Sequence, residues 1–254
     1  NDIVEHECST GEISKITRYS SEPQVLILHT HTSESYEPYT KEWYDEQYSS
    51  RSPDPQNGVV AVGNAVAYEL ARAGISVVHD CTLYDTVYKG AYERSLEAAL
   101  MIMEQYPSIR YVLDIHRDAI EYEDGSRISA VTEINGKKAA QVMIICAADD
   151  GTYDVPDFYK NLHFASEFQQ GMESMFPTLT RPVLFQYCQY NQQISPGALL
   201  LEVGSHGNST DQAIYSGELI GKALSALLIQ NSVAPEKKES VLSGVPLYFF
   251  NRII

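Results

Sequence analysis

The residues best suited to chemistry are two histidines and a carboxylate that follow an apolar segment near the start of the chain. His29, His31 and Glu34 come directly after residues 25–28, which read Val-Leu-Ile-Leu and predict a buried strand reaching residue 29. Proteins with α/β folds place functional groups where strands give way to loops. Imidazole and carboxylate are common zinc ligands, and His31 and Glu34 are three residues apart. The segment therefore predicts a metal hydrolase, provided that a third ligand lies elsewhere.

A third ligand is available at the end of another apolar strand. His116 lies near the end of residues 111–118, which read YVLDIHRD, and we expect it at the same edge of the sheet as His31. Two histidines and one carboxylate leave a coordination position open for water, as catalytic zinc sites do. Magnesium and calcium prefer oxygen ligands. We therefore predict zinc bound by His31, Glu34 and His116.

His29 leaves an alternative open. On an extended segment, His29 and His31 project their rings to the same side, so either could be the ligand. We favour His31 as the ligand and His29 as a supporting group that orients the site. The other histidines are read as ordinary core or surface residues: His6, His79, His163 and His206.

A general base is expected on a later strand. Glu202 is the one carboxylate in the apolar run 199–204, and a buried glutamate is costly unless it is paired or functional. Burial would raise its pKa toward the range useful for acid–base catalysis. A structural ion pair is the alternative interpretation, but we predict that Glu202 is the catalytic base.

Polar residues around the third ligand and in one loop are candidates for supporting roles. Arg117 could clamp a substrate carboxylate or stabilise an oxyanion, so we group it with Glu202 as catalytic. Asp114 and Asp118 could hold a ligand histidine in the required tautomer. Each is equally compatible with a structural role. The amide-rich loop 190–196 could bind the polar edges of a peptide or sugar, although an ordinary capped loop fits as well; its candidate substrate-binding residues are Asn191, Gln192 and Ser195.

The hydrophobic periodicity indicates alternating strands and helices. Strands are predicted at 25–29, 75–78, 110–115, 142–146, 183–187 and 199–203, and helices at 59–73, 92–106, 157–175 and 210–228. This alternation predicts one α/β domain with a mostly parallel sheet covered by helices on both faces. Asn135-Gly136 is a strong hairpin signal, so we expect a mixed sheet. The domain should span 23–230, between an N-terminal arm, 1–22, and a C-terminal tail, 231–254.

The bulk composition limits the classes of molecule that the chain can bind. The chain has 254 residues, 44% of them hydrophobic, and a formal net charge of -16. Such a charge disfavours nucleic acid and anionic membrane surfaces as partners. No segment is long and apolar enough to span a bilayer. The chain begins at Asn1 without a methionine, so we expect an excised fragment whose missing export signal carries no information. Of its four cysteines, Cys146 and Cys188 are expected to be small buried hydrophobic residues.

Four motifs, in this order, resemble one protein family. They are HTHTSESY at 29–36, VYKGAYERS at 87–95, DIHRDA at 114–119 and YNQQISPGALLLEVGSHGN at 190–208. Together they are similar to stage II sporulation protein P, which is related to the zinc-dependent N-acetylmuramoyl-L-alanine amidases, and the resemblance runs from about residue 25 to 228. It implies a mostly parallel α/β sheet, with His31 as the first zinc ligand, His116 as the last and Glu202 as the catalytic glutamate.

The second ligand departs from the amidase pattern. Amidases place that glutamate at the start of the first helix, whereas residues 55–59 here contain no acid and only Asp54 is nearby. Glu34 is then the best substitute, and its His-x-x-Glu spacing is similar to that of the zinc carboxypeptidases.

The resemblance also implies a function and a cellular setting. It implies hydrolysis of peptidoglycan at the amide between N-acetylmuramic acid and L-Ala, and of stem-peptide cross-links, during engulfment of the forespore. The implied partner is the lytic transglycosylase stage II sporulation protein D. The expected location is outside the cytoplasm, facing the cell wall, with a membrane anchor upstream of this chain.

Two other interpretations are compatible with parts of the sequence. An amidohydrolase-type barrel also opens with His-x-His, but it needs further histidines and an aspartate at later strand ends. A catalytically silent wall-binding module could retain metal for structure alone. Glu202 argues against the silent module, because such a module has no need of a buried base.

Overall fold

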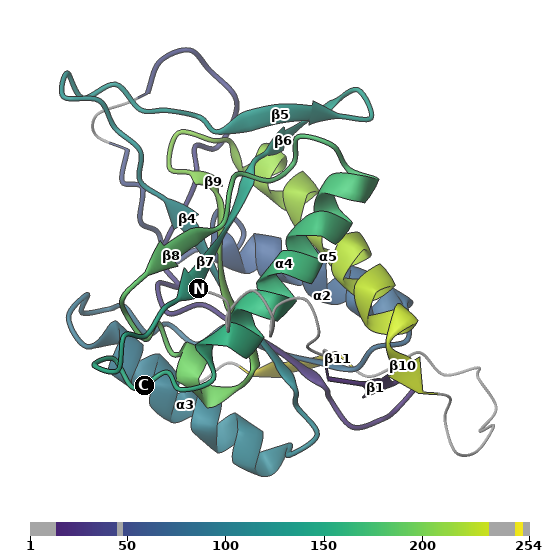
Figure 1. Cartoon of the computed structure of the whole chain (residues 1–254). Coiled ribbons are helices and arrows are strands. Elements are labelled where there is room, and N and C mark those ends of the chain that lie inside the picture. The colour runs from purple at the N-terminus through teal and green to yellow at the C-terminus, as the bar shows by residue number, and fades with distance from the viewer. Residues whose placement is uncertain (1–13, 45–47, 234–246, 251–254) are drawn as a thin grey trace.

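The computed structural model describes residues 14–44, 48–233 and 247–250, and a seven-stranded sheet lies at its centre (Figure 1). Strands β11, β3, β2, β4 and β9 run parallel, whereas β7 is antiparallel to β9 and β8 is parallel to β7. In spatial order the strands are β11 (Leu247–Phe250), β3 (Val77–Asp80), β2 (Val25–Leu28), β4 (Tyr111–Asp118), β9 (Gly197–Ser205), β7 (Val142–Ala147) and β8 (Leu184–Gln186). Because the sheet is open, with β11 and β8 at its edges, the amidohydrolase-type barrel is excluded.

Helices cover both faces of this sheet, as the alternation predicted. Three helices pack on one face, namely α2 (Val59–Arg72), α4 (Phe158–Met175) and α5 (Thr210–Gln230), and α3 (Ala91–Gln105) packs on the other. Successive residues of β2 alternate between the two cores: Val25 and Ile27 join the larger one, and Leu26 and Leu28 join the one beneath α3. None of the described helices combines the length and apolarity needed to cross a bilayer.

The sheet is mixed, but not for the reason that the sequence suggested. Asn135 and Gly136 do form a tight hairpin turn, both with positive φ (53° and 74°). It joins β5 (Val131–Ile134) to β6 (Lys137–Ala140), which make a separate two-stranded sheet. That sheet is attached to α5, because the Tyr215 hydroxyl donates to the Ile134 carbonyl. The antiparallel pair within the central sheet is β7–β9 instead.

The described parts of the predicted arm and tail contact each other and the domain. β1 (Ile16–Thr17) pairs in parallel with β10 (Ser232–Val233), and the Ile16 side chain is buried in the larger core. β11, from the predicted tail, extends the sheet beside β3. The remainder of the arm, 1–13, and of the tail, 234–246 and 251–254, lies outside the described residues.

The cysteine prediction is half correct. Cys146 is buried in β7, as expected, but Cys188 is exposed. Cys188 follows β8, a short edge strand whose residues are themselves poorly covered, so the chain beyond it runs over the surface. Cys81 is partly buried, and Cys8 lies outside the described residues.

Candidate metal centre

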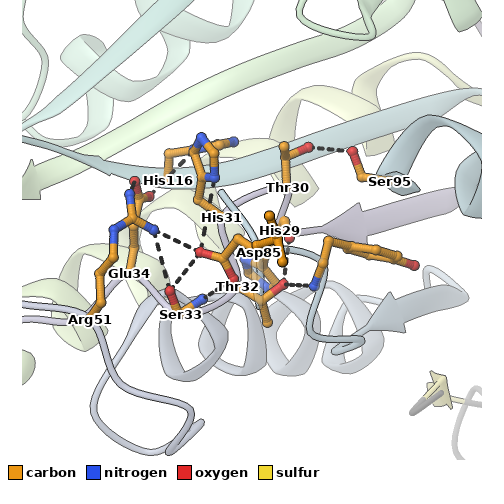
Figure 2. A network of polar contacts seen from close by, with 12 residues as sticks. His29, Thr30, His31, Thr32, Ser33, Glu34, Arg51, Asp85, Ser95 and His116 are labelled. Carbon is orange, nitrogen blue, oxygen red and sulfur yellow. Dashed lines mark hydrogen bonds and ion pairs between the residues drawn. The ribbon is translucent and has the colours of Figure 1, made fainter. Parts of the chain in front are cut away.

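The carboxyl ends of β2 and β4 bring three predicted ligands together. The two strands are paired, with Leu28 opposite Asp114, so the loop after β2 meets the end of β4. The rings of His31 and His116 lie 5.4 Å apart, centroid to centroid, and are nearly perpendicular. The Glu34 Oε2 atom lies 3.4 Å from His116 Nδ1. All three side chains are buried, and Figure 2 shows them converging.

Glu34 is held beside the start of the first helix. Its backbone N–H donates to the His31 carbonyl, and its own carbonyl accepts from Val59, the first residue of α2. A Cβ at Gly58 would lie 2.3 Å from the Glu34 carbonyl oxygen, so this close approach requires glycine. Glu34 thus lies next to the helix start at which the amidase pattern places its acid, although it comes from the preceding loop.

The opposite side of the His116 ring meets a second carboxylate. His116 Nε2 lies 2.9 Å from Asp114 Oδ1, and Asp114 also accepts from the backbone and hydroxyl of Thr30. A carboxylate behind a histidine fixes the orientation of the ring at metal sites. Burial alone would lower the pKa of His116, but Asp114 and Glu34 outweigh it and raise the pKa well above its ordinary value.

The donor atoms of this cluster fit a zinc ion. Nδ1 of His31 and Oε2 of Glu202 are buried without a hydrogen-bond partner in the described part of the chain, which is uncommon for buried polar atoms. Two imidazoles and a carboxylate are a zinc donor set. Over the same residues, no three such side chains are already arranged as a complete metal-binding group. Glu34 is instead paired directly with the His116 ring.

His29 is turned into the core rather than toward this cluster. Its Nδ1 atom lies 2.9 Å from the Ile115 carbonyl oxygen, and its Nε2 atom lies 2.9 Å from Nε2 of His79. Because a carbonyl only accepts, Nδ1 carries the proton and Nε2 accepts from His79. Burial lowers the pKa of both rings. With both nitrogens occupied, the geometry favours His31 over His29 as the ligand.

Glu202 lies on β9 directly across from His116. The two residues are register partners, so their side chains leave the same face of the sheet. The pKa of Glu202 is raised to about 7, because the effect of burial outweighs that of the neighbouring His116, which lowers the pKa. A carboxyl group with such a pKa can both accept and return a proton near neutral pH.

Two charged residues at the site were missed by the sequence analysis. Asp85 accepts hydrogen bonds from the backbone and hydroxyl of Ser33 and from Arg51 Nη1, and it lies 4.0 Å from His31 Nδ1 (Figure 2). Arg51 also reaches Glu34, at 3.5 Å. Asp85 could have been found by its position, because it follows β3, whose carboxyl end lies at the same edge as that of β2.

Two tyrosines of the VYKGAYERS motif pack on the candidate ligands. The Tyr88 ring stacks on the His31 ring, with the centroids 4.6 Å apart, and the Arg51 guanidinium also lies over the Tyr88 ring, 5.1 Å from its centroid. The Tyr92 ring is nearly parallel to that of His116, at 6.3 Å. The motif indicated the family, but neither tyrosine was expected at the site.

The remaining predicted site residues contact the protein itself. The Arg117 guanidinium donates to the carbonyls of Ser35 and Ser50, so it holds the loop between β2 and α2 in place. Asp118 pairs with Arg181 at 3.0 Å. Asn191 donates hydrogen bonds to the Tyr92 carbonyl and the Ser95 hydroxyl. Gln192 donates to the Ile145 carbonyl and accepts from the Ala147 backbone N–H. The Ser195 hydroxyl donates to the Arg110 carbonyl. Such contacts are those expected of an ordinary capped loop, and the substrate-binding role of these three residues stays a prediction.

Fold and site together define an α/β protein with a candidate zinc centre at the carboxyl edge of its parallel strands. The sequence pattern of the stage II sporulation protein P family matches residues 2–225, so the chain belongs to that family. Stage II sporulation protein P of Bacillus subtilis (strain 168) is 26% identical over 233 residues, covering 82% of this chain and 55% of the relative. The chain therefore spans about half the length of that curated relative.

Several solved amidase structures are similar to this chain. The CwlD amidase from Clostridioides difficile, in complex with the GerS lipoprotein, superposes with a TM-score of 0.49 at 12% identity, covering 82% of this chain and 99% of that one. An N-acetylmuramoyl-L-alanine amidase from Clostridium difficile 630 superposes with a TM-score of 0.46 at 16% identity, covering 83% of this chain and 97% of that one. The amidase AmiC2 of Nostoc punctiforme superposes with a TM-score of 0.45 at 12% identity, covering 82% of this chain and 96% of that one.

Proposed function

We propose that this chain is a zinc-dependent peptidoglycan hydrolase that acts in sporulation. It cleaves the amide between N-acetylmuramic acid and L-Ala, and also stem-peptide cross-links, during engulfment. The observation that carries the proposal is the convergence of His31, Glu34 and His116 at one edge of the sheet, with Glu202 directly across from His116. Membership of the stage II sporulation protein P family supports the substrate class.

Each residue of the candidate centre has a separate role in the proposed reaction. His31, Glu34 and His116 hold the metal, which when bound supplies Lewis acidity toward a carbonyl oxygen and toward water. Glu202 accepts a proton from the attacking water and returns it to the leaving amine. Asp114 fixes the ring of His116 through its 2.9 Å contact.

Arg51 takes the substrate-facing role that the sequence analysis gave to Arg117. Its side chain is 37% exposed, and it is anchored to Asp85 and Glu34 beside the centre. A guanidinium held in this way can bind a substrate carboxylate or carbonyl. Arg117, together with Asn191, Gln192 and Ser195, acts as a positioning residue that shapes the surrounding loops.

The setting of the full protein belongs to the same proposal. The enzyme works outside the cytoplasm on the cell wall, with a membrane anchor in the part of the protein upstream of this chain. A lytic transglycosylase similar to stage II sporulation protein D acts with it. Family membership supports these statements, and the chain's acidic charge is consistent with a partner other than nucleic acid.

The test is the release of muropeptides from purified sacculi by Glu202→Gln. We expect wild-type zinc content with a loss of release of at least about a hundredfold, since general acid–base groups contribute about 10²–10⁴-fold. Glu218→Gln, on the outer side of α5, is the matched control. Wild-type release by the zinc-loaded Glu202→Gln variant would contradict the mechanism. Binding of sacculi without any release by the wild-type chain would establish the silent wall-binding module instead.

A further inference from the structure

A cavity lies beside the loop that carries Glu34. It has a volume of about 300 Å³, and its walls include Glu37, Trp43, Tyr44 and Arg127. Glu37 is three residues beyond Glu34, and Gly207, which also lines the cavity, is five residues beyond Glu202. The segments that supply the ligand Glu34 and the base Glu202 therefore continue into the walls of this cavity.

Two aromatic rings of the cavity are held in place by cations. Trp43, the single tryptophan of the chain, is 63% exposed, and Lys41 Nζ lies 4.5 Å from its ring centroid. The Arg127 guanidinium lies 4.1 Å from the ring centroid of Tyr44, whose hydroxyl donates to the Gly125 carbonyl. A large exposed aromatic ring supported in this way is a preformed apolar platform.

The polar groups of the cavity balance one another. The Glu37 side chain is 4% exposed, and its two oxygens lie 3.3 Å from Arg127 Nη1 and 3.0 Å from Lys41 Nζ. Its backbone is fixed by bonds to Asn208 and Thr210 at the start of α5. Within the described lining of the cavity, Glu37 pairs with both Lys41 and Arg127 and Glu42 adds a further negative charge, so the cavity does not favour an anionic ligand.

We propose that this cavity binds a neutral N-acetylated amino-sugar unit of the glycan strand. A pyranose ring has an apolar C–H face, which stacks on the Trp43 ring, and a rim of hydroxyl and amide groups. The hydroxyls of Ser126 and Ser129 in the cavity wall supply hydrogen-bond partners for that rim. The inference rests on the proposed function, because it gives the glycan part of the same substrate a site of its own next to the catalytic centre.

The single tryptophan makes the proposal directly measurable. The probe is the β-1,4-linked tetramer of N-acetylglucosamine, which contains no peptide bond for the enzyme to cut. We expect a saturable change in Trp43 emission with the wild-type chain. By calorimetry, Trp43→Ala should bind the tetramer at least about tenfold more weakly. Tyr68→Ala is the matched control, because Tyr68 is 59% exposed and its ring also faces a cation, Arg72, but it lies on α2.

The outcomes separate this inference from the proposed hydrolase function. Glu202→Gln should still bind the tetramer, since sugar binding does not need the base. Binding that persists in a chain without hydrolytic activity would support the cavity and contradict the proposed function. Tetramer binding unaffected by Trp43→Ala, or absent at millimolar concentration in a chain that hydrolyses sacculi, would overturn the cavity. So would Trp43-dependent binding of free stem peptide in place of the tetramer.

Discussion

The Nε2 atoms of His29 and His79 lie 2.9 Å apart in the core beneath the candidate metal centre. The other nitrogen of His29 donates to the carbonyl of Ile115, the residue before His116. His29 therefore reaches the site through the backbone of β4 rather than by contact with a metal. Through these contacts the histidine pair joins the end of β2 to β3 and β4, just before the positions of the predicted ligands His31 and His116.

The packing of α2 on this histidine pair gives the first prediction. A Cβ at Gly63 would lie 2.6 Å from His79 Nε2 and 2.7 Å from His29 Nε2. We expect Gly63→Ala to lower the free energy of unfolding by about 1–3 kcal/mol, because overpacking forces the rings or the helix to move. Urea unfolding measures it. Gly171→Ala in α4 is the control: nothing lies within 4 Å of its added Cβ, so a gain of about 0.5–1 kcal/mol is expected. Equal effects of the two changes would refute the contact.

Zinc content distinguishes the two histidines that the sequence left as alternatives. We expect His31→Ala to lose bound zinc after dialysis, because it removes a ligand. His29→Ala should keep zinc but unfold at a lower urea concentration, since it removes a buried ring with two polar contacts. Metal per chain is measured by mass spectrometry alongside the unfolding curves. Retention of zinc by His31→Ala together with its loss from His29→Ala would reverse the assignment.

The sequence predicted those parts of the molecule that depend on local pattern. Each predicted helix is present with ends within two residues, because the apolar spacing that marks a helix also buries it. His31, His116 and Glu202 were predicted as site residues because each is a polar residue at or near the end of an apolar run. The second strand begins two residues later than expected, at Val77 rather than residue 75, since an apolar run alone does not mark where pairing starts.

The rest of the site depends on contacts between distant segments. Asp85 and Arg51 meet across 34 positions of sequence, and nothing in the local pattern of either residue indicates the other. Arg117 also shows this dependence, because its position beside a predicted ligand suggested a substrate role. Its partners are backbone carbonyls of another loop, which no spacing rule identifies. Composition identifies polar groups, but only the tertiary structure decides which of them are already paired.

Replacing Arg51 or Arg117 by alanine should affect the protein in different ways. Arg51→Ala removes a partly exposed guanidinium from the edge of the site, so we expect KM for muropeptide substrates to rise by about tenfold or more. Arg117→Ala removes a donor from the Ser35 carbonyl and one of the two donors of the Ser50 carbonyl, which keeps its bond from the Ser35 N–H. It should therefore lower the free energy of unfolding by about 1–3 kcal/mol and reduce kcat through the displaced loop. Steady-state kinetics and urea unfolding on both variants test the division. An unchanged KM in Arg51→Ala would remove its substrate role.

Glu173 gives a pH-dependent prediction away from the site. Its carboxylate accepts from the backbone of Thr178 and from the backbone and hydroxyl of Thr180. Burial acts to raise the pKa of Glu173, but these hydrogen bonds outweigh it and hold the pKa below its ordinary value of 4.5. They also fix Thr178, a β-branched residue at a φ of 73°, in the left-handed region that such residues avoid.

The sign of the effect follows from that lowered pKa. Stability from the ionised carboxylate is fully present above the ordinary pKa and is lost as pH falls through the folded-state pKa. We therefore expect Glu173→Gln to be less stable than wild type at pH 7 by about 1 kcal/mol, with the difference shrinking as pH falls below about 4. Urea unfolding at several pH values measures it, with Glu167→Gln on the same helix as the control. A difference that stays constant from pH 7 to pH 3 would show that the charge of Glu173 is not what holds this turn.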